Sequence, residues 1–169
     1  MRCAVICTDK TAARVRIRRS RIGDARAIID MADALNRHEG KPPTPLTEES
    51  VRRHMFGRRR ILACLIAEID GCIAGYVAYQ PSLDMETGST GLYMSDLFVR
   101  EAARRRGVGR ALMSAVAREG LRGGHSWLAW NAMTSNPEAL AFYRAIGAKR
   151  VEVATYSIAV DRLLGPTGR

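Results

Sequence analysis

The hydrophobic period of the sequence changes at one turn, and this change most constrains the fold. Residues 91–99 are largely apolar and are typical of a buried strand. From Gly107 onward the apolar residues recur at helical spacing, as at Val108, Leu112 and Val116. A strand that passes into a helix through a short turn indicates a domain that mixes both kinds of element.

Further strands and helices are expected on both sides of this turn. Strands are predicted at residues 14–18, 61–69, 72–79, 91–99, 126–133 and 151–160. Helices are predicted over 23–40, from 47, over 107–123 and over 136–147. At 169 residues, and with about 150 residues per domain, the chain is expected to hold one α/β domain over 14–163. Residues 1–13 are then a flexible leader and 164–169 a tail.

The chain carries 27 Lys and Arg against 17 Asp and Glu, a net charge of +10, and only three of the positive residues are lysines. Three interpretations are open: nucleic-acid binding, arginines scattered over a solvated surface, and a local site for an anionic ligand. Five arginines lie within residues 100–110, and the remaining positive charge is expected to be dispersed. Because 47% of the residues are hydrophobic, a disordered chain is excluded.

The turn after residue 99 has the chemistry of an anion site. Gly107 and Gly109 allow the backbone to wrap closely around a ligand, and the following helix offers unpaired N–H groups. Both the helix terminus and the arginines favour a phosphate or pyrophosphate. The turn lacks the third glycine of a dinucleotide fingerprint and the Gly-Lys-Ser/Thr end of a Walker loop.

No metal site, membrane span or signal peptide is expected from the rest of the sequence. The four cysteines and the histidines lack metal-ligand spacing, and no apolar run approaches the roughly 18 residues of a membrane span. Residues 1–13 contain Asp9 and Lys10 and lack the apolar stretch of a signal peptide. We therefore expect a cytoplasmic protein.

Two motifs resemble the GCN5-related N-acetyltransferase (GNAT) superfamily. Arg104-x-x-Gly107-x-Gly109 matches the family's Arg/Gln-x-x-Gly-x-Gly/Ala signature after a strand. The later stretch from Asn136 through Phe142-Tyr143 to Gly147 resembles the family's Asn…Phe-Tyr…Gly helix. This resemblance, which extends over residues 14–160, implies an acyl-CoA N-acyltransferase fold with a central, mostly antiparallel sheet flanked by helices.

The resemblance also implies acetyl-CoA as the acetyl donor, and a homodimer by analogy. Backbone groups of Leu97, Phe98 and Val99 are expected to pair with the pantetheine arm in the manner of an added strand. An amide near Leu97 or Phe98 is expected to polarise the thioester carbonyl. Asn136 and Tyr143 complete the expected contacts near the arm and the sulfur. The pyrophosphate is expected at the turn, which consists of Arg104, Arg105, Arg106, Gly107, Val108, Gly109 and Arg110.

Candidate catalytic residues follow from the need to remove a proton from the amine and to supply one to the thiolate. Tyr143 is the candidate proton donor, although Phe142-Tyr143 also suits an aromatic packing pair. Asp96 is a candidate base, although strand alternation leaves open which face of the sheet it occupies. Candidate substrate residues, each of which also suits a solvated surface, are His38, Glu39, Asp84 and Ser95.

Leu92-Tyr-Met-Ser-Asp-Leu-Phe-Val99 is similar to a strand of the diamine and thialysine acetyltransferase branch. Ser95 stands where that branch carries a Glu that helps to handle the amine. The charge of +10 also disfavours a polycation as substrate, because it repels such a molecule at long range.

The sequence therefore predicts an N-acetyltransferase that acts on the primary amine of a small molecule through a tetrahedral intermediate. Three alternatives are an enzyme that acetylates a protein N-terminus or lysine, a CoA-binding domain without catalysis, and a nucleic-acid-binding protein. Few aromatic residues, 6% of the chain, argue against the last.

Overall fold

The computed structural model describes residues 14–163, and the predicted leader and tail lie outside this range. The chain divides into two compact units, one ending at Asn136 and the other beginning at Pro137. In the first unit a five-stranded sheet has the order β1-β2-β3-β4-β5. Its strands are β1 (Arg16–Arg19), β2 (Ala63–Ile69), β3 (Cys72–Leu83), β4 (Thr90–Val99) and β5 (Trp127–Trp130). The first four pair antiparallel and β5 pairs with β4 in parallel, which confirms the predicted mixed, mostly antiparallel sheet.

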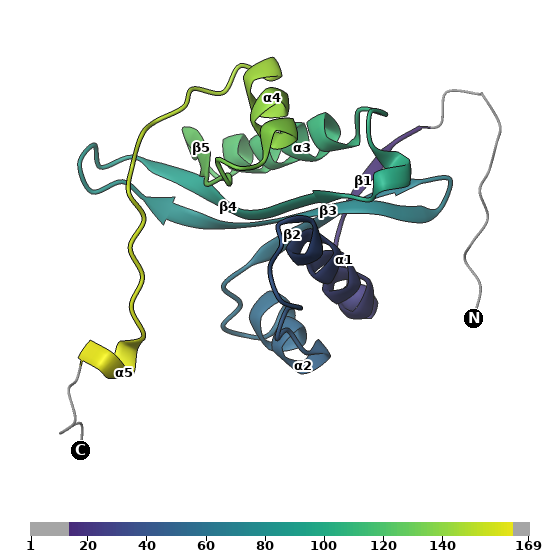
Figure 1. The fold of residues 1–169 in the computed structure, drawn as a ribbon, viewed down its shortest axis with the longest axis horizontal. Coiled ribbons are helices and arrows are strands. Elements are labelled where there is room, and N and C mark those ends of the chain that lie inside the picture. Colours follow the sequence, from purple (N-terminus) through teal and green to yellow (C-terminus); the bar gives the residue numbers. More distant parts are fainter. Residues whose placement is uncertain (1–13, 164–169) are drawn as a thin grey trace. The chain divides into compact units, whose positions relative to one another are not determined.

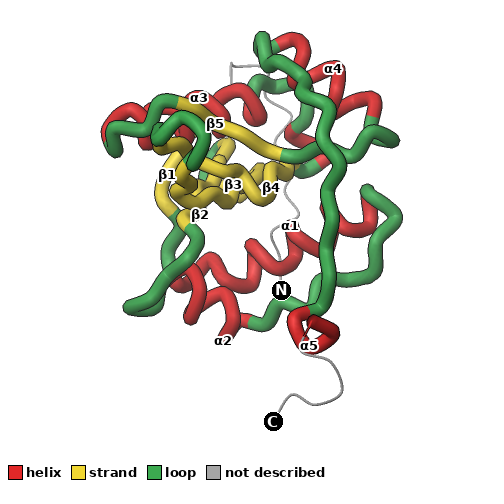
Figure 2. Tube along the Cα trace, turned by 90° about the vertical axis from the view of Figure 1, so that its left-hand side faces the viewer, coloured by secondary structure: helices red, strands yellow, loops and turns green. Residues whose placement is uncertain are grey.

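Helices cover both faces of this sheet (Figures 1 and 2). One face carries α1 (Ala25–His38) and α2 (Glu48–Val51), the latter followed by a π-helical turn, η2 (Arg52–Phe56). The other face carries α3 (Val108–Arg122), which contacts β2, β3 and β4. Short 3-10 turns, η1 (Ile22–Asp24) and η3 (Glu101–Ala103), precede α1 and follow β4.

Each face buries its own apolar side chains, as expected for a sheet between two helical layers. On the α1 face, Ile28 and Met31 of α1 pack with Ile66, Tyr76 and Phe98 of the strands. On the α3 face, Val108, Leu112 and Val116 form the helical stripe that the sequence predicts, and all three are fully buried. The predicted hairpin is also confirmed: Asp70 and Gly71 both have positive φ, at 51° and 76°, as a tight two-residue hairpin turn requires.

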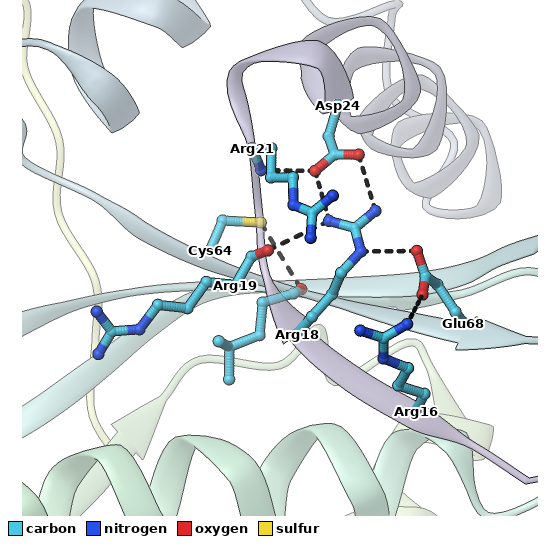
Figure 3. A network of polar contacts seen from close by, with 8 residues as sticks. Arg16, Arg18, Arg19, Arg21, Asp24, Cys64 and Glu68 are labelled. Carbon is cyan, nitrogen blue, oxygen red and sulfur yellow. Dashed lines mark hydrogen bonds and ion pairs between the residues drawn. The ribbon is translucent and has the colours of Figure 1, made fainter. Parts of the chain in front are cut away.

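A half-buried ionic network fixes the start of α1 against the sheet (Figure 3). The Arg18 guanidinium donates from Nη1 and Nη2 to the two Asp24 oxygens at 2.7 and 2.9 Å, and from Nε to Glu68 at 2.6 Å. Asp24 also accepts a bond from the Arg21 amide at 2.6 Å. These bonds lower the pKa of Asp24, with the Arg18 hydrogen bond as the largest cause. β1, β2 and α1 are thereby joined through one arginine side chain.

The second unit contains α4 (Pro137–Ala145) and α5 (Val160–Leu163). The predicted strand at 151–160 is wrong, because residues 151–159 form no regular element and α5 begins at Val160. Val151, Val153 and Tyr156 are 74%, 72% and 91% exposed. β-Branched and aromatic composition favours a strand only where a neighbour supplies backbone partners, and the described part of this unit contains only helices and loops.

None of the helices within residues 14–163 has the length and apolar content that a bilayer crossing requires.

Candidate active site

The turn between β4 and α3 is built by backbone conformation. Arg105 and Gly107 have φ of 60° and 78°, in the left-handed region that glycine adopts most easily. The Gly107 carbonyl accepts the first helical bond of α3, from the Ala111 amide at 2.9 Å. A Cβ at Gly107 would meet no atom within 4 Å of its position, so this glycine is needed for its conformation. The predicted anion seat therefore has the expected strand, turn and helix order.

The arginines of residues 100–110 divide into two groups. Arg100 and Arg104 hold the turn to the sheet, because their Nε atoms donate to the carbonyls of Ile73 and Val99 at 3.1 and 3.3 Å. Arg105, Arg106 and Arg110 are exposed. Their charges lie at the N-terminal end of α3, a helix of 15 residues whose first amides point in the same direction. This arrangement suits a polyphosphate group.

β4 has an open edge next to this turn. Its parallel partner β5 pairs only with Gly91 through Met94, so within the first unit no described strand pairs with Ser95 through Val99 on that side. Open backbone N–H and C=O groups are a template for an extended ligand chain. Leu97, Phe98 and Val99 all lie on this open segment.

A bulge in β4 decides which way its acidic residue faces. Ala78 of β3 pairs with Asp96, whereas the next residue, Tyr79, pairs with Met94, so Ser95 is the extra residue. A bulge interrupts the alternation of side chains and is common next to active sites. Ser95 Oγ lies 3.4 Å from Gln80 Oε1, and Asp96 accepts a bond from Tyr76. Both side chains therefore reach the α1 face. This answers which face of the sheet Asp96 occupies, which strand alternation alone leaves open.

Asp96 is held by a buried tyrosine that sequence reasoning missed. The Tyr76 hydroxyl donates to Asp96 Oδ2 at 2.9 Å, and Tyr76 is only 1% exposed. Burial raises the pKa of Tyr76, and the charges of Asp96 and Glu39 raise it further. The phenol therefore remains protonated and donates to the carboxylate. The only sequence signal is a tyrosine in the middle of an otherwise apolar strand.

The remaining substrate candidates are placed differently. Glu39, the residue that caps α1, is half-buried and lies close enough to Tyr76 to act on its pKa. His38, the last residue of α1, is exposed. Asp84 accepts bonds from the Thr87 hydroxyl at 2.8 Å and the Glu86 amide at 2.9 Å in the turn after β3. These bonds, first that of Thr87, lower the pKa of Asp84.

The structure thus brings Ser95, Asp96 and Glu39 to one face and leaves Asp84 in a hairpin. Asp84 follows the last residue of β3, and residues 79–83 lie between it and Ala78, which pairs with Asp96. At about 3.3 Å per residue, this separation prevents Asp84 and Asp96 from forming one acidic pocket.

The other candidates lie near or beyond the boundary between the units. Asn136 is the last residue of the first unit, and its amide donates to the Met133 carbonyl at 3.0 Å. Tyr143 lies on α4 in the second unit, half-buried, with its ring 5.3 Å from that of Phe142 at a tilt of 56°. Within residues 14–163 no group of His, Cys, Asp and Glu side chains could hold a metal ion.

One prediction about the charge is wrong. The positive charge outside residues 100–110 is not dispersed, because residues 52–60 contain another five arginines, Arg52, Arg53, Arg58, Arg59 and Arg60. All five are exposed. A count of arginines in a sliding window would have found this stretch.

Comparison with known proteins identifies related sequences. A family model described as "Acetyltransferase (GNAT) family" matches residues 29–148. Thialysine N-epsilon-acetyltransferase from Bos taurus is 30% identical over 144 residues, which cover 80% of this chain and 84% of the relative. L-ornithine N5-acetyltransferase NATA1 from Arabidopsis thaliana is 34% identical over 80 residues, 47% of this chain and 35% of that protein.

Solved structures show the same fold. An integron cassette protein from the mobile metagenome of V. cholerae superposes with a TM-score of 0.74 at 23% identity, covering 89% of this chain and 98% of that one. The aminoglycoside N-acetyltransferase AAC(6')-Iy, solved in complex with CoA, superposes with a TM-score of 0.73 at 19% identity, covering 90% and 99%.

Proposed function

The chain belongs to the acetyltransferase (GNAT) family, and we propose from this premise that it transfers the acetyl group of acetyl-CoA to a primary amine of a small molecule. The names of two relatives support a small amine, because one acts on thialysine and the other on ornithine. The observation that carries the proposal is the bulge in β4. With this bulge Asp96 lies on the α1 face, where it accepts a hydrogen bond from the Tyr76 hydroxyl.

The donor end of the proposed site consists of the turn and the open edge of β4. Backbone amides and the exposed side chains of Arg105, Arg106 and Arg110 would bind the pyrophosphate. Backbone groups of residues 97–99 would bind the pantetheine arm along the unpaired edge. Asn136 follows from the family motif as a further contact to the arm. The positive φ of Gly107 and the paired guanidinium of Arg104 hold this turn in shape before any ligand arrives.

The acceptor end is acidic. A protonated amine has no lone pair with which to attack, so a base must first accept its proton. Asp96 is the proposed base, either directly or through a water molecule, and Tyr76 orients its carboxylate. Glu39 lies close by as well, but its carboxylate is paired with Lys41 Nζ at 2.5 Å, so the negative charge offered to a cationic amine is that of Asp96.

In the proposed reaction the amine nitrogen forms a bond to the thioester carbonyl carbon while an amide near Leu97 or Phe98 stabilises the oxyanion. The carbon–sulfur bond then breaks, and Tyr143 supplies a proton to the departing thiolate. The amine loses one proton to Asp96 before it attacks, and the second proton of its nitrogen, lost as the intermediate collapses, restores the phenol of Tyr143. No covalent acetyl-enzyme is formed. The support for Tyr143 is its place in the family's Asn…Phe-Tyr…Gly motif.

The test is thiol release from acetyl-CoA across a panel of thialysine, ornithine, spermidine and a peptide with a free N-terminus. We expect turnover with a small amine, and a loss in kcat of about 100-fold in Tyr143→Phe. Tyr156→Phe is the matched control, because Tyr156 belongs to the same unit and is 91% exposed. Turnover confined to the peptide would replace the small amine with a protein substrate, and no turnover above hydrolysis would refute the proposal. A homodimer and a cytoplasmic location stay predictions.

A further inference from the structure

The sheet has a gap where two neighbouring strands, β2 and β3, differ in length. β3 continues to Leu83, but β2 begins at Ala63, which pairs with Tyr79. Residues 80–83 of β3 therefore have no β2 neighbour. A cavity of about 400 Å³ occupies this place, which we call the strand-end cavity, and Leu62, Tyr79 and Leu92 line it. Its volume lies in the range of small-molecule sites, roughly 300–1,000 Å³.

Tyr79 contributes to the strand-end cavity a hydroxyl that no described residue binds. Tyr79 is 6% exposed, and none of its contacts is a hydrogen bond from the hydroxyl. Every fully buried side-chain nitrogen or oxygen among the described residues has a partner, so this hydroxyl is open to the cavity. Burial raises the pKa of Tyr79, followed by the charge of Glu119, so the phenol is a hydrogen-bond donor at neutral pH.

The charges around the strand-end cavity favour an anion. Two arginines, Arg19 and Arg60, line it together with one acid, Glu119. The Glu119 carboxylate is already paired twice, with Arg19 at 2.5 Å and Arg122 at 2.9 Å. Arg60 is exposed and has no carboxylate partner among residues 14–163. It also follows Arg58 and Arg59, so the positive potential extends outward from the opening.

The walls of the strand-end cavity are apolar. Phe56, Leu62, Pro81 and Leu92 contribute hydrocarbon surface between the polar groups. Such a cavity, with a few convergent polar groups in an apolar lining, is typical of a site for a small organic ligand. A bare inorganic anion would leave the apolar walls uncovered, so an anion with an apolar body fits this lining better.

We propose that the strand-end cavity binds a small amphipathic anion, an apolar ring or branched chain that carries one carboxylate. The carboxylate pairs with Arg60 at the opening, and the body of the ligand lies on Phe56, Leu62 and Leu92. The Tyr79 hydroxyl donates a hydrogen bond to it. This site differs from the proposed acetyl-transfer site in its lining, which contains neither Asp96 nor Ser95, although Met55 and Cys64 of the α1-face core contribute to it.

The test is calorimetric titration of the full chain with phenylacetate, using phenylacetamide as the uncharged compound of the same shape. We expect saturable binding of phenylacetate and about tenfold weaker binding of phenylacetamide, because the charge-assisted bond is lost. Arg60→Gln should remove this difference between the two compounds, and Tyr79→Phe should weaken both by several-fold, on the order of one hydrogen bond. Thermal melting of each variant confirms that it is folded.

Two matched controls locate the ligand. Arg59→Gln changes the net charge equally at a side chain that does not line the strand-end cavity, and Arg105→Gln does so at the β4–α3 turn. Both should bind phenylacetate as the wild type does. Absence of saturable phenylacetate binding overturns the proposal. So does equal weakening in Arg59→Gln, which indicates general attraction, or weakening only in Arg105→Gln, which places the anion at the turn.

Discussion

Two stretches of this chain, residues 100–110 and residues 52–60, carry five arginines each, yet their backbones differ. The first stretch passes through positive φ at Arg105 and Gly107 and ends in a helix of 15 residues. The second stretch forms a π-helical turn and a loop before β2 begins. Backbone amides therefore converge in the first stretch, whereas the second offers only side-chain charge beside the strand-end cavity.

Arginine density alone therefore does not identify a phosphate site. A polyphosphate group needs amides and charges that point to one place, and of the two stretches the turn before α3 combines them. A carboxylate on an apolar body needs one cation and an apolar wall, which the second stretch and its cavity supply. Arg18 shows a third use, in which an arginine is fully engaged by Asp24 and Glu68.

The largest effect is expected from the substitution Gly107→Glu, which attacks the backbone of the first stretch. A side chain at φ of 78° is strained, and a carboxylate there repels phosphates, so acetyl-CoA binding should be lost. Gly88→Glu is the matched control, because Gly88 also has positive φ, at 68°, and open space, but lies in the β3–β4 hairpin. Calorimetry with CoA measures both. Retained affinity in Gly107→Glu would contradict the placement of the pyrophosphate.

The substitution Asp96→Asn tests whether the chemistry lies apart from both arginine stretches. Removing a general base should lower kcat by about 100-fold or more while acetyl-CoA affinity stays unchanged. The measurement is steady-state thiol release with the best amine of the panel, together with CoA calorimetry. Asp30→Asn serves as control, since Asp30 is exposed on α1 and paired only with Arg26. An unchanged kcat in Asp96→Asn would exclude Asp96 as the base.

The substitution Asp24→Asn tests the ionic network of Arg18, which lies outside both arginine stretches. Loss of the charge-assisted bonds from Arg18 should lower the free energy of unfolding by about 2 kcal/mol at pH 7. Because the pKa of Asp24 is lowered in the folded state, this contribution is present above the ordinary aspartate value near 4. It is lost as the pH falls through the folded value. Urea unfolding at pH 7 and at pH 3 should therefore show a smaller difference from wild type in acid, and an equal difference would contradict this linkage.

The substitution Tyr76→Phe removes the hydroxyl that orients Asp96 and leaves the ring. We expect kcat to fall by about tenfold, the value of one hydrogen bond to a charged group. Thermal melting separates this effect from a loss of stability, because Tyr76 belongs to the α1-face core. Tyr93→Phe on β4 is a control for removing a phenol from the sheet. A variant with wild-type kcat would show that Asp96 needs no orientation by Tyr76.

The smallest effect is expected when charges are removed from each arginine stretch in turn. Arg105→Gln combined with Arg106→Gln should raise the KM for acetyl-CoA several-fold, roughly the effect of two exposed charges beside an anion. Arg58→Gln combined with Arg59→Gln removes the same charge from the second stretch and should leave this KM unchanged. Equal effects in the two pairs, measured at low and high salt, would mean that net charge alone attracts the cofactor.

Most local elements of this protein follow from short stretches of its sequence. The Asp70-Gly71 hairpin, the period change at Gly107 and the two family motifs depend on residues close in sequence, so they could be predicted without the fold. The conformational demand on Gly107 follows from the same local rule.

Where the side chains meet depends instead on how the strands pair. The bulge at Ser95 exists because β4 and β3 differ by one residue in register, and a single strand carries no record of its partner's register. That bulge turns Asp96 toward Tyr76, while Asp84 is engaged by its own hairpin. The strand-end cavity likewise results from the unequal lengths of β2 and β3. Strand pairing is a long-range property, and these features are its consequences.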